Sequence, residues 1–221
     1  MEHLEQAKTA LQQAGVTFVA VSANGVCVTS DKKGIAPMME MLETNPSMLS
    51  DAVVADKVIG KAAAFLLIKG GVKAVYAQMI SQHALDTLQN TDIVVQYQNV
   101  VPYIINRNKD GMCPMEETVL SIQDAEQAFV ALQQKRRALE QKKNKEILLQ
   151  NLEKIHTTPL GIERIQRNIG LSCDVVAWCK NCIKTATDIK RKGKNWYVCQ
   201  DNIQITIHAS SYTIITAHKQ I

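Results

Sequence analysis

The sequence lacks any apolar run of the roughly 18 to 20 residues that a membrane-spanning helix requires. The first residues, Met1 to Glu5, also lack the basic start and apolar stretch of a secretory signal peptide. We therefore expect a cytoplasmic protein with no membrane partner. Because that compartment is reducing, its cysteines should be thiols and not disulfides; they are Cys27, Cys113, Cys173, Cys179, Cys182 and Cys199.

The 221 residues suffice for one large core or two smaller ones. Charge is distributed unevenly along them. Residues 1–120 carry 9 Lys and Arg against 12 Asp and Glu, whereas residues 121–221 carry 16 against 9. The net charges are thus −3 and +7. A basic second half suits an anionic partner such as RNA, although solvated Lys-rich helices give the same count.

Helical and strand patterns alternate over the first part of the chain. Helices are predicted at 2–14, 35–44, 56–69 and 82–89, and strands at 16–22, 25–30, 52–55, 72–78 and 93–97. The first two strands form a hairpin with Asn24-Gly25 at its turn. This order predicts an α/β domain over residues 1–125, a three-layer α/β/α sandwich with a largely parallel sheet and an antiparallel hairpin at one edge.

The second half has a different pattern. A helical signal resumes after Pro114 and continues to about residue 155, but residues 140–146 contain no apolar side chain, which predicts two turns that nothing buries. We therefore expect a basic helical linker over 126–155. Residues 156–221 then predict a small α+β domain with helices at 162–168 and 174–185 and an antiparallel meander of strands at 196–200, 203–208 and 212–217.

Four segments of the first domain occur together in a known family. They are Ala55 to Ala64 (Ala55-Asp56-Lys57-Val58-Ile59-Gly60-Lys61-Ala62-Ala63-Ala64), Val72 to Ser81, Tyr103-Ile104-Ile105-Asn106-Arg107 and Gly111-Met112-Cys113-Pro114-Met115-Glu116. With these motifs, residues 5–125 resemble the uncharacterised family called domain of unknown function 1893. The resemblance implies a cytidine-deaminase-like fold and no settled activity.

The residues that zinc-dependent deamination needs are missing from the predicted helix starts. Such an enzyme uses a His or Cys ligand with a Glu two residues later at one helix start, and Pro-Cys-x-x-Cys at the next. The first predicted start, Asp56-Lys57-Val58, would place Val58 where the proton carrier belongs. The second, Met79 to His83, has no cysteine. We therefore expect no zinc deaminase, and assign no metal or cofactor.

Polar residues near these helix starts form a candidate ligand site. Two helix N-termini at the mouth of a sheet, with Lys57, Lys61, Arg107 and Lys109 nearby, suit an anion such as a nucleotide phosphate. Alternatively, Lys57 and Lys61 simply flank an Ala-rich helix. The candidate ligand-binding residues are Asp56, Lys57, Lys61, Ser81, Asn106, Arg107, Cys113 and Glu116.

Cys113 and Glu116 are also candidate catalytic residues, and three interpretations of them remain open. Cys113-x-x-Glu116 has the spacing of two ligands on one helix, and Asp56 could complete a metal site. Cys113-Pro114 is equally typical of a plain helix start. A thiol at a helix N-terminus is the third alternative, since that position favours a reactive thiolate.

The C-terminal segment resembles a second uncharacterised family, domain of unknown function 3781, which implies no activity. The resemblance rests on His156-Thr157-Thr158, Gly161 to Ile165, Gly193 to Tyr197 and Ser211 to His218. His218 should share a strand face with Thr216, and His208 on the neighbouring strand could lie across from them. Paired histidines beside cations suit acid/base cleavage of RNA, and His208 and His218 are therefore candidate catalytic residues.

Simple RNA contact, with Trp196 and Tyr197 as stacking surfaces, is the alternative to cleavage. The candidate nucleic-acid-binding residues are Lys192, Lys194, Trp196, Tyr197, His208, Tyr212, Thr216 and His218. A purely structural interpretation places Trp196 and Tyr197 in the core and the histidines on the surface. Cys179-x-x-Cys182 similarly allows zinc, redox activity or ordinary buried side chains.

The sequence thus favours a ligand- or nucleotide-binding protein on a deaminase-like scaffold, without zinc-dependent activity. The alternative is an RNA-binding or RNA-cleaving protein that acts through its basic C-terminal domain. A third hypothesis gives either domain an oligomerisation surface; the oligomeric state does not follow from the sequence.

Overall fold

A computed structural model describes residues 2–220. The chain forms two compact units, residues 1–135 and 136–221, each with its own sheet and core. The helix α6 (Ala125–Gln150) supplies side chains to both: Ala128 and Leu132 are buried in the first core and Leu148 in the second.

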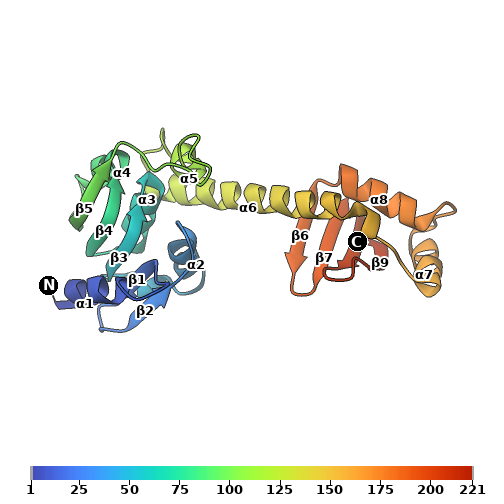
Figure 1. The fold of residues 1–221 in the computed structure, drawn as a ribbon, viewed down its shortest axis with the longest axis horizontal. Helices are drawn as coiled ribbons and strands as arrows, with labels where there is room; N and C mark the ends of the chain where they lie inside the picture. The colour runs from blue at the N-terminus through green and yellow to red at the C-terminus, as the bar shows by residue number, and fades with distance from the viewer. Residues whose placement is uncertain (1, 221) are drawn as a thin grey trace. The chain divides into compact units, whose positions relative to one another are not determined.

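The first unit contains a five-stranded mixed sheet in the order β2-β1-β3-β4-β5 (Figure 1). Its strands are β1 (Phe18–Val21), β2 (Cys27–Ser30), β3 (Val53–Ile59), β4 (Ala74–Ser81) and β5 (Val94–Val101). The β1–β2 and β1–β3 pairs are antiparallel, whereas β3, β4 and β5 run parallel. The predicted hairpin edge and the parallel strands are both present.

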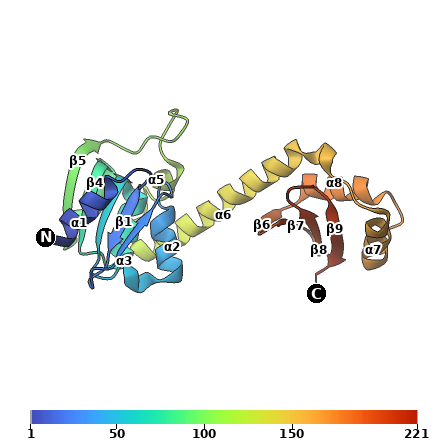
Figure 2. The ribbon, with the colours of Figure 1, turned by 60° about the horizontal axis from the view of Figure 1, so that its bottom comes forward.

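Helices cover the two faces of this sheet. Helix α1 (Glu2–Leu11) buries Leu4, Ala7 and Leu11 against one face (Figure 2). The opposite face holds the larger core with α2 (Ala36–Thr44), α3 (Lys61–Gly70) and α4 (Gln82–Leu88); a short 3-10 turn, η1 (Pro46–Met48), follows α2. Helix α3 is apolar almost throughout and ends where Gly71 adopts the left-handed conformation, φ +66°.

Helix α3 begins five residues later than the sequence predicts. Asp56, Lys57 and Val58 continue β3, pairing with β1 on one side and β4 on the other, so they are not a helix start. The Asp56 carboxylate accepts a hydrogen bond from the Val58 amide, 2.9 Å away, within the strand. The true helix starts are Lys61 and Gln82, preceded by Gly60 and Ser81.

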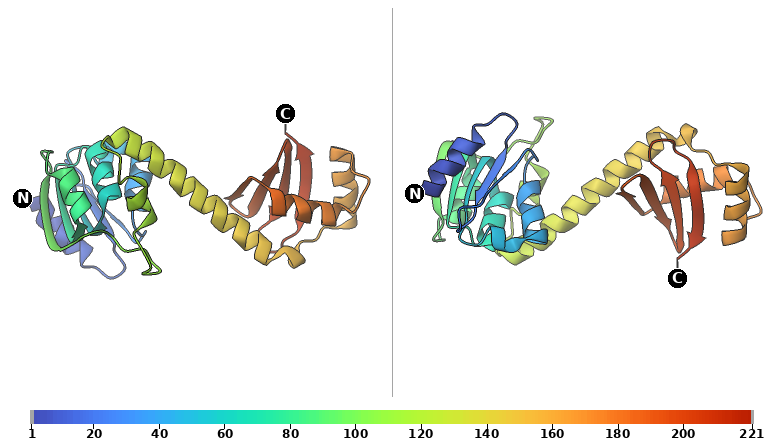
Figure 3. Two further views of the ribbon diagram at one scale, coloured as in Figure 1. Left: turned by 90° about the horizontal axis from the view of Figure 1, so that it is seen from above. Right: turned by 90° about the horizontal axis from the view of Figure 1, so that it is seen from below.

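The second unit contains a four-stranded antiparallel meander. Its strands, in spatial order, are β6 (Asp188–Lys192), β7 (Asn195–Gln200), β8 (Ile203–His208) and β9 (Ile214–Lys219). Helix α8 (Val175–Thr185) buries Cys179 and Ile183 against one face of the sheet (Figure 3). The turn η2 (Leu152–Lys154) and helix α7 (Pro159–Ile169) precede it, and α7 packs beside β9.

Two expectations for this half are wrong. The strand β6 was not predicted, because four of its five residues are charged and hide the strand pattern. Residues 140–146 are not an unburied pair of turns: Asn144 is only 6% exposed and donates to the carbonyl oxygen of Ile189 in β6, 3.0 Å away. Across residues 2–220, no helix combines the length and apolar character that crossing a bilayer demands.

Candidate functional site

Three donors from three separate segments converge on the carboxylate of Glu116. Helix α5 (Pro114–Thr118) carries this residue, whose side chain is 1% exposed. Its Oε1 accepts from the first amide of α3, that of Lys61 at 3.0 Å, and from the hydroxyl of Ser81. Its Oε2 accepts from the Ile104 amide at 2.6 Å. The cluster lies at the carboxyl ends of the neighbouring parallel strands β3 and β4, where α3 and α4 begin.

Gly60 makes room for this carboxylate. A Cβ atom at position 60 would lie 3.2 Å from Cδ of Glu116 and 2.9 Å from Cγ1 of Ile104. The Ser81 hydroxyl also caps α4 by accepting from the Ala84 amide at 3.1 Å. A single buried carboxylate therefore joins the starts of α3 and α4 to the segment that follows β5.

Lys61 contributes its backbone to this cluster, and its ammonium group has a different partner. The side-chain nitrogen donates to the Leu120 carbonyl at 2.6 Å and lies 5.5 Å from the centre of the Phe65 ring. Desolvation lowers the pKa of Lys61, while the nearby Asp86 and Glu116 carboxylates oppose that change. The predicted ligand-binding residues Lys61, Ser81 and Glu116 are thus brought together.

His83 belongs to the same cluster, although the sequence analysis did not select it. Its Nδ1 lies 3.6 Å from Oε1 of Glu116, which is beyond normal hydrogen-bond length. Its side chain is 35% exposed, but Nδ1 itself is buried and has no hydrogen-bond partner. A position in the first turn of α4 was the only sequence signal for it.

Asp56 is also buried, but its environment differs. One carboxylate oxygen accepts from the Val58 amide, and the other, Oδ2, has no hydrogen-bond partner. Burial raises the pKa of Asp56 to about 8, and hydrogen bonds from the Val58 and Lys57 amides partly offset this rise. In most molecules the Asp56 carboxyl group is therefore protonated at neutral pH. The neighbouring Lys57 is half-buried, and its amide donates to the Thr17 carbonyl.

The remaining predicted residues of the first unit lie on the segment after β5. Asn106 holds a tight turn by bonding Asp110, and Arg107 is exposed on that turn. Cys113 is half-buried and precedes α5; its amide donates to the Ile104 carbonyl at 2.7 Å. The helix start expected at Cys113-Pro114 is present, with Pro114 as the first helical residue. A reactive thiol at this helix start stays a prediction.

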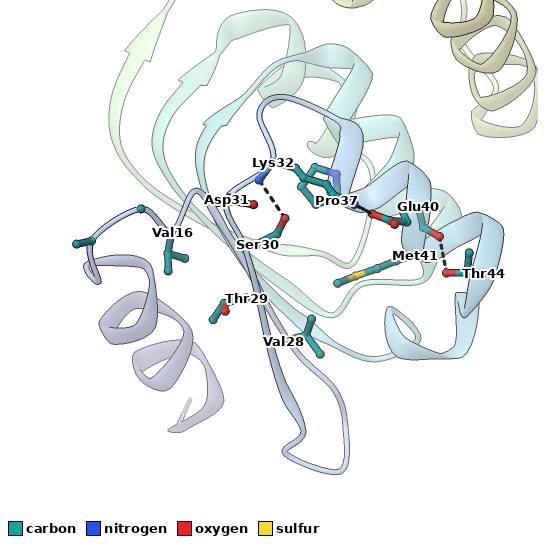
Figure 4. A pocket seen from close by; sticks show the side chains of 12 residues that line it. Val16, Val28, Thr29, Ser30, Asp31, Lys32, Pro37, Glu40, Met41 and Thr44 are labelled. Carbon is teal, nitrogen blue, oxygen red and sulfur yellow. Dashed lines mark hydrogen bonds and ion pairs between the residues drawn. The ribbon is translucent and has the colours of Figure 1, made fainter. Parts of the chain in front are cut away.

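A separate open cavity of about 700 Å³ lies between β2 and α2 and contains none of the predicted site residues (Figure 4). Val28 and Ser30 line one side, and Pro37 and Met41 the other. Its charged residues are Asp31, Lys32 and Glu40, of which Lys32 and Glu40 form an ion pair with each other. With that pair neutral, Asp31 gives the lining a net negative charge, which does not favour an anionic ligand.

In the second unit, two histidines are connected by two hydroxyl groups. His208 Nδ1 lies 3.0 Å from Oγ of Ser211, which lies 2.8 Å from Oγ1 of Thr213. Thr213 Oγ1 in turn lies 3.2 Å from Nε2 of His156, and Nδ1 of His156 lies 2.9 Å from the Lys154 carbonyl oxygen. We call His156, Thr213, Ser211 and His208 the hydroxyl relay. It faces solvent, since Ser211 and His156 are exposed.

Hydrogen-bond directions in the relay are set at its two ends. A carbonyl oxygen only accepts, so Nδ1 of His156 carries a proton. At the other end the Ser211 amide donates to Nδ1 of His208, 3.4 Å away, so that nitrogen is an acceptor. Between the two ends, either hydroxyl can be the donor in the contact between Ser211 and Thr213.

The predicted pairing of His208 with His218 is wrong. In the register of β8 and β9, His218 is opposite Gln204, at the far end of β8 from His208. The partner of His208 is instead His156, which precedes α7 and which a parallel bridge joins to Thr213. The pairing could not be recognised from the sequence because His156 and Thr213 are 57 residues apart.

The other predicted nucleic-acid-binding residues are dispersed. Trp196 is 1% exposed in the core, so the expectation that its ring stacks on a base is wrong. Tyr197 is half-buried on β7, and Lys192 and Lys194 are exposed beside the β6–β7 turn. Tyr212 is half-buried beneath the ammonium group of Lys154, 5.7 Å from the ring centre, and Thr216 accepts from Asn168.

Cys179 and Cys182 are buried side chains of the second core. Burial raises the pKa of the Cys179 thiol to about 12, with the neighbouring Cys182 adding to the effect. Such a thiol stays protonated at neutral pH, which favours the interpretation as ordinary core residues over redox activity. Within residues 2–220, no group of three or more His, Cys, Asp or Glu side chains has an arrangement that could hold a metal ion.

These observations define a two-unit protein: an α/β unit with a buried carboxylate at the mouth of its mixed sheet, and an α+β unit with a hydroxyl relay beside its antiparallel sheet. The chain belongs to the family described as "Domain of unknown function (DUF1893)", whose model matches residues 6–136. A second model, "Protein of unknown function (DUF3781)", matches residues 149–218. Both predicted resemblances are thereby confirmed.

The first unit is similar to a solved structure, that of a DUF1893 family protein from Thermotoga maritima. The two chains are 26% identical, and the match covers 61% of this chain and 90% of that one with a TM-score of 0.56. Among curated proteins, no match was found.

Proposed function

We propose that the first unit is a deaminase-like scaffold that binds a small anion of the nucleotide-phosphate class and carries out no zinc-dependent hydrolysis. The scaffold assignment is supported by α3 and α4 beginning at the ends of neighbouring parallel strands. The actual helix starts, Lys61-Ala62-Ala63 and Ser81-Gln82-His83-Ala84, still offer no Glu and no cysteine for the zinc motif.

The observation that carries the anion proposal is the convergence of the Lys61 amide, the Ser81 hydroxyl and the Ile104 amide on one carboxylate. Donors of this kind at a helix N-terminus favour negative charge. Glu116 supplies that charge from within the chain. We infer that a phosphate takes its place, with the five-residue helix α5 moving outward, so Glu116 acts as an internal competitor.

Calorimetric titration of the full chain with inorganic phosphate and with cytidine monophosphate tests this proposal. Glu116→Gln keeps the size of the side chain and removes its charge, so we expect affinity for both probes to rise at least about tenfold, the equivalent of roughly 1.4 kcal/mol. Glu117→Gln, on the same helix and exposed, is the matched control and should leave affinity unchanged. Equal affinities in wild type and Glu116→Gln, or no binding to either, would refute the proposal.

The hydroxyl relay supports a second candidate function, cleavage of RNA by the second unit. One imidazole would take the proton of a ribose 2′-hydroxyl, whose oxygen attacks the adjacent phosphorus. The other, as an imidazolium, would protonate the departing 5′-oxygen, leaving a 2′,3′-cyclic phosphate and a 5′-hydroxyl. Transfer through Thr213 and Ser211 would then restore the starting protonation states.

Incubation of the full chain with a short single-stranded RNA tests this candidate. Cleavage should stop with His156→Ala and with His208→Ala, and continue with His218→Ala, which lies outside the relay. The same oligonucleotide with a 2′-deoxyribose at the scissile position should stay intact. RNA that survives the wild-type protein, or cleavage that depends equally on His218, would rule the candidate out.

A further inference from the structure

The strand β5 forms an open edge of the first sheet (Figure 1). Within residues 2–220 its only strand partner is β4. Its sequence, Val94-Val95-Gln96-Tyr97-Gln98-Asn99-Val100-Val101, contains no charge and no proline. Edge strands normally carry such residues because they prevent pairing with other chains. β5 therefore lacks the usual protection of a free edge.

The exposed apolar side chains on β5 have an unusual distribution. Val94, Tyr97 and Val100 are 55%, 48% and 43% exposed, and they lie at equal intervals along the strand. The pattern is symmetric about Tyr97, with Gln96 and Gln98 on either side of it. When a second copy of such a strand runs antiparallel to the first, side chains of the same kind lie opposite each other.

The backbone permits this self-match. The Val94 amide donates to the Lys73 carbonyl next to β4, so Val94 and, two residues later, Gln96 direct their backbone groups into the sheet. Because orientation alternates along a strand, Val95, Tyr97 and Asn99 direct their backbone groups outward. Antiparallel pairing needs outward-facing residues opposite each other, and a two-fold axis at Tyr97 fulfils this requirement.

We propose that β5 pairs with β5 of a second copy of this chain, antiparallel and centred on Tyr97. Tyr97 then lies opposite its own copy, and Val94 lies opposite Val100 of the partner chain. All three exposed apolar side chains thus pair with one another, and Gln96 lies opposite Gln98. The two five-stranded sheets become one continuous sheet. The partner is a second copy because the match is between the strand and itself.

Sedimentation of the full chain at tens of micromolar tests the proposal. We expect a species of twice the 24.5 kDa chain mass. Tyr97→Lys places two like charges opposite each other and should give the single-chain mass. Val26→Lys is the control, because Val26 is 55% exposed, equal to Val94, and lies away from β5. A monomeric wild type, or a dimer that survives Tyr97→Lys, would overturn the proposal.

Disulfide formation tests the register. With the exposed Cys27 and Cys173 replaced by serine, Tyr97→Cys should form an interchain disulfide under mild oxidation, because directly opposite residues lie about 5.5 Å apart between Cα atoms. In the proposed register, residue 99 lies opposite Val95 of the second copy and not opposite residue 99. Asn99→Cys should therefore form at least tenfold less interchain disulfide than Tyr97→Cys. A Tyr97→Cys protein that does not cross-link, or equal cross-linking of the two variants, would contradict the two-fold pairing.

Discussion

The mouth of the first sheet and the hydroxyl relay of the second unit are both polar clusters, but they differ in solvent access and in charge. Glu116 is 1% exposed and accepts from three fixed donors. The relay faces solvent, and each of its hydroxyl groups can donate in either direction. A buried ionic cluster fixes one arrangement, because any unsatisfied group is costly. A solvated cluster of hydroxyls and imidazoles permits two. We therefore expect the first to govern stability and the second to govern proton position.

Removal of the buried carboxylate should have the largest effect. Glu116→Ala leaves three donors without their acceptor, each worth about 1 to 3 kcal/mol when buried. We expect the free energy of unfolding to fall by about 4 kcal/mol, measured by urea denaturation of the full chain. Glu117→Ala, one residue further on α5 and exposed, should change it by less than about 0.5 kcal/mol. Equal losses in the two variants would show that the network is not formed in solution.

Asp56 sharpens the comparison because it is a buried carboxyl without such a network. Its pKa in the folded chain is about 8, well above the ordinary value of 3.8, so the folded state keeps the proton that the unfolded state loses. Stability should therefore fall as pH rises from about 4 to 8. Asp56→Asn removes this loss, and its unfolding free energy should exceed that of wild type by a few kcal/mol at pH 8.

The control for this prediction is Asp31→Asn, which removes one exposed carboxylate from the same unit. Its unfolding free energy should follow the wild-type pH dependence. Denaturation curves at pH 5 and pH 8 measure the difference. If Asp56→Asn and wild type lose the same stability between these pH values, Asp56 is not the buried titrating group.

A smaller loss is expected when the space beside Glu116 is filled. Gly60→Ala would place a methyl group 2.9 Å from Ile104 and 3.2 Å from the Glu116 carboxyl carbon. Overpacking of this kind costs about 1 to 3 kcal/mol. Gly111→Ala, whose nearest neighbour would be 3.6 Å away, is the matched control and should cost little. Thermal melting of the two variants measures the difference. Similar melting temperatures would mean that α5 shifts to accommodate the methyl group with no loss of stability.

The smallest stability effect is expected in the relay. Thr213→Val keeps the shape of the side chain and breaks the path between His156 and His208. Because the site is solvated, the melting temperature should change little, whereas the hydrogen bond at Nε2 of His156 should be lost. The chemical shift of that imidazole nitrogen at one fixed pH would show this, and Thr216→Val, on β9, is the control that should leave it unchanged. An unchanged Nε2 shift in Thr213→Val would contradict the relay.

Local patterns predicted most elements of the fold, and the failures have identifiable causes. The β1–β2 hairpin and the apolar helix α3 were recognised from turn residues and periodicity. The start of α3 was misplaced because Asp56, a residue type common at helix starts, precedes the Ala-rich run, whereas pairing with β1 and β4 keeps it in β3. The strand β6 was missed because it is charged, and the burial of Asn144 depends on a carbonyl 45 residues away.

The candidate sites show the same division between local and distant signals. Lys61, Ser81 and Glu116 were selected because they lie near helix starts, but their hydrogen bonds span 35 and 55 residues. No sequence pattern indicates that the Glu116 carboxylate accepts from all three donors. In the second unit, His208 was selected and His156 was not, because only the fold places His156 beside Thr213.

The amide resonances of Lys61 and Ile104 provide the most direct test of Glu116 as an internal occupant of an anion site. In the full chain, Glu116→Gln should shift both resonances, and titration of wild type with cytidine monophosphate should shift the same two. Our account predicts that these two amides respond together in both experiments. Nucleotide-induced shifts confined to other residues, or amides that ignore Glu116→Gln, would contradict it.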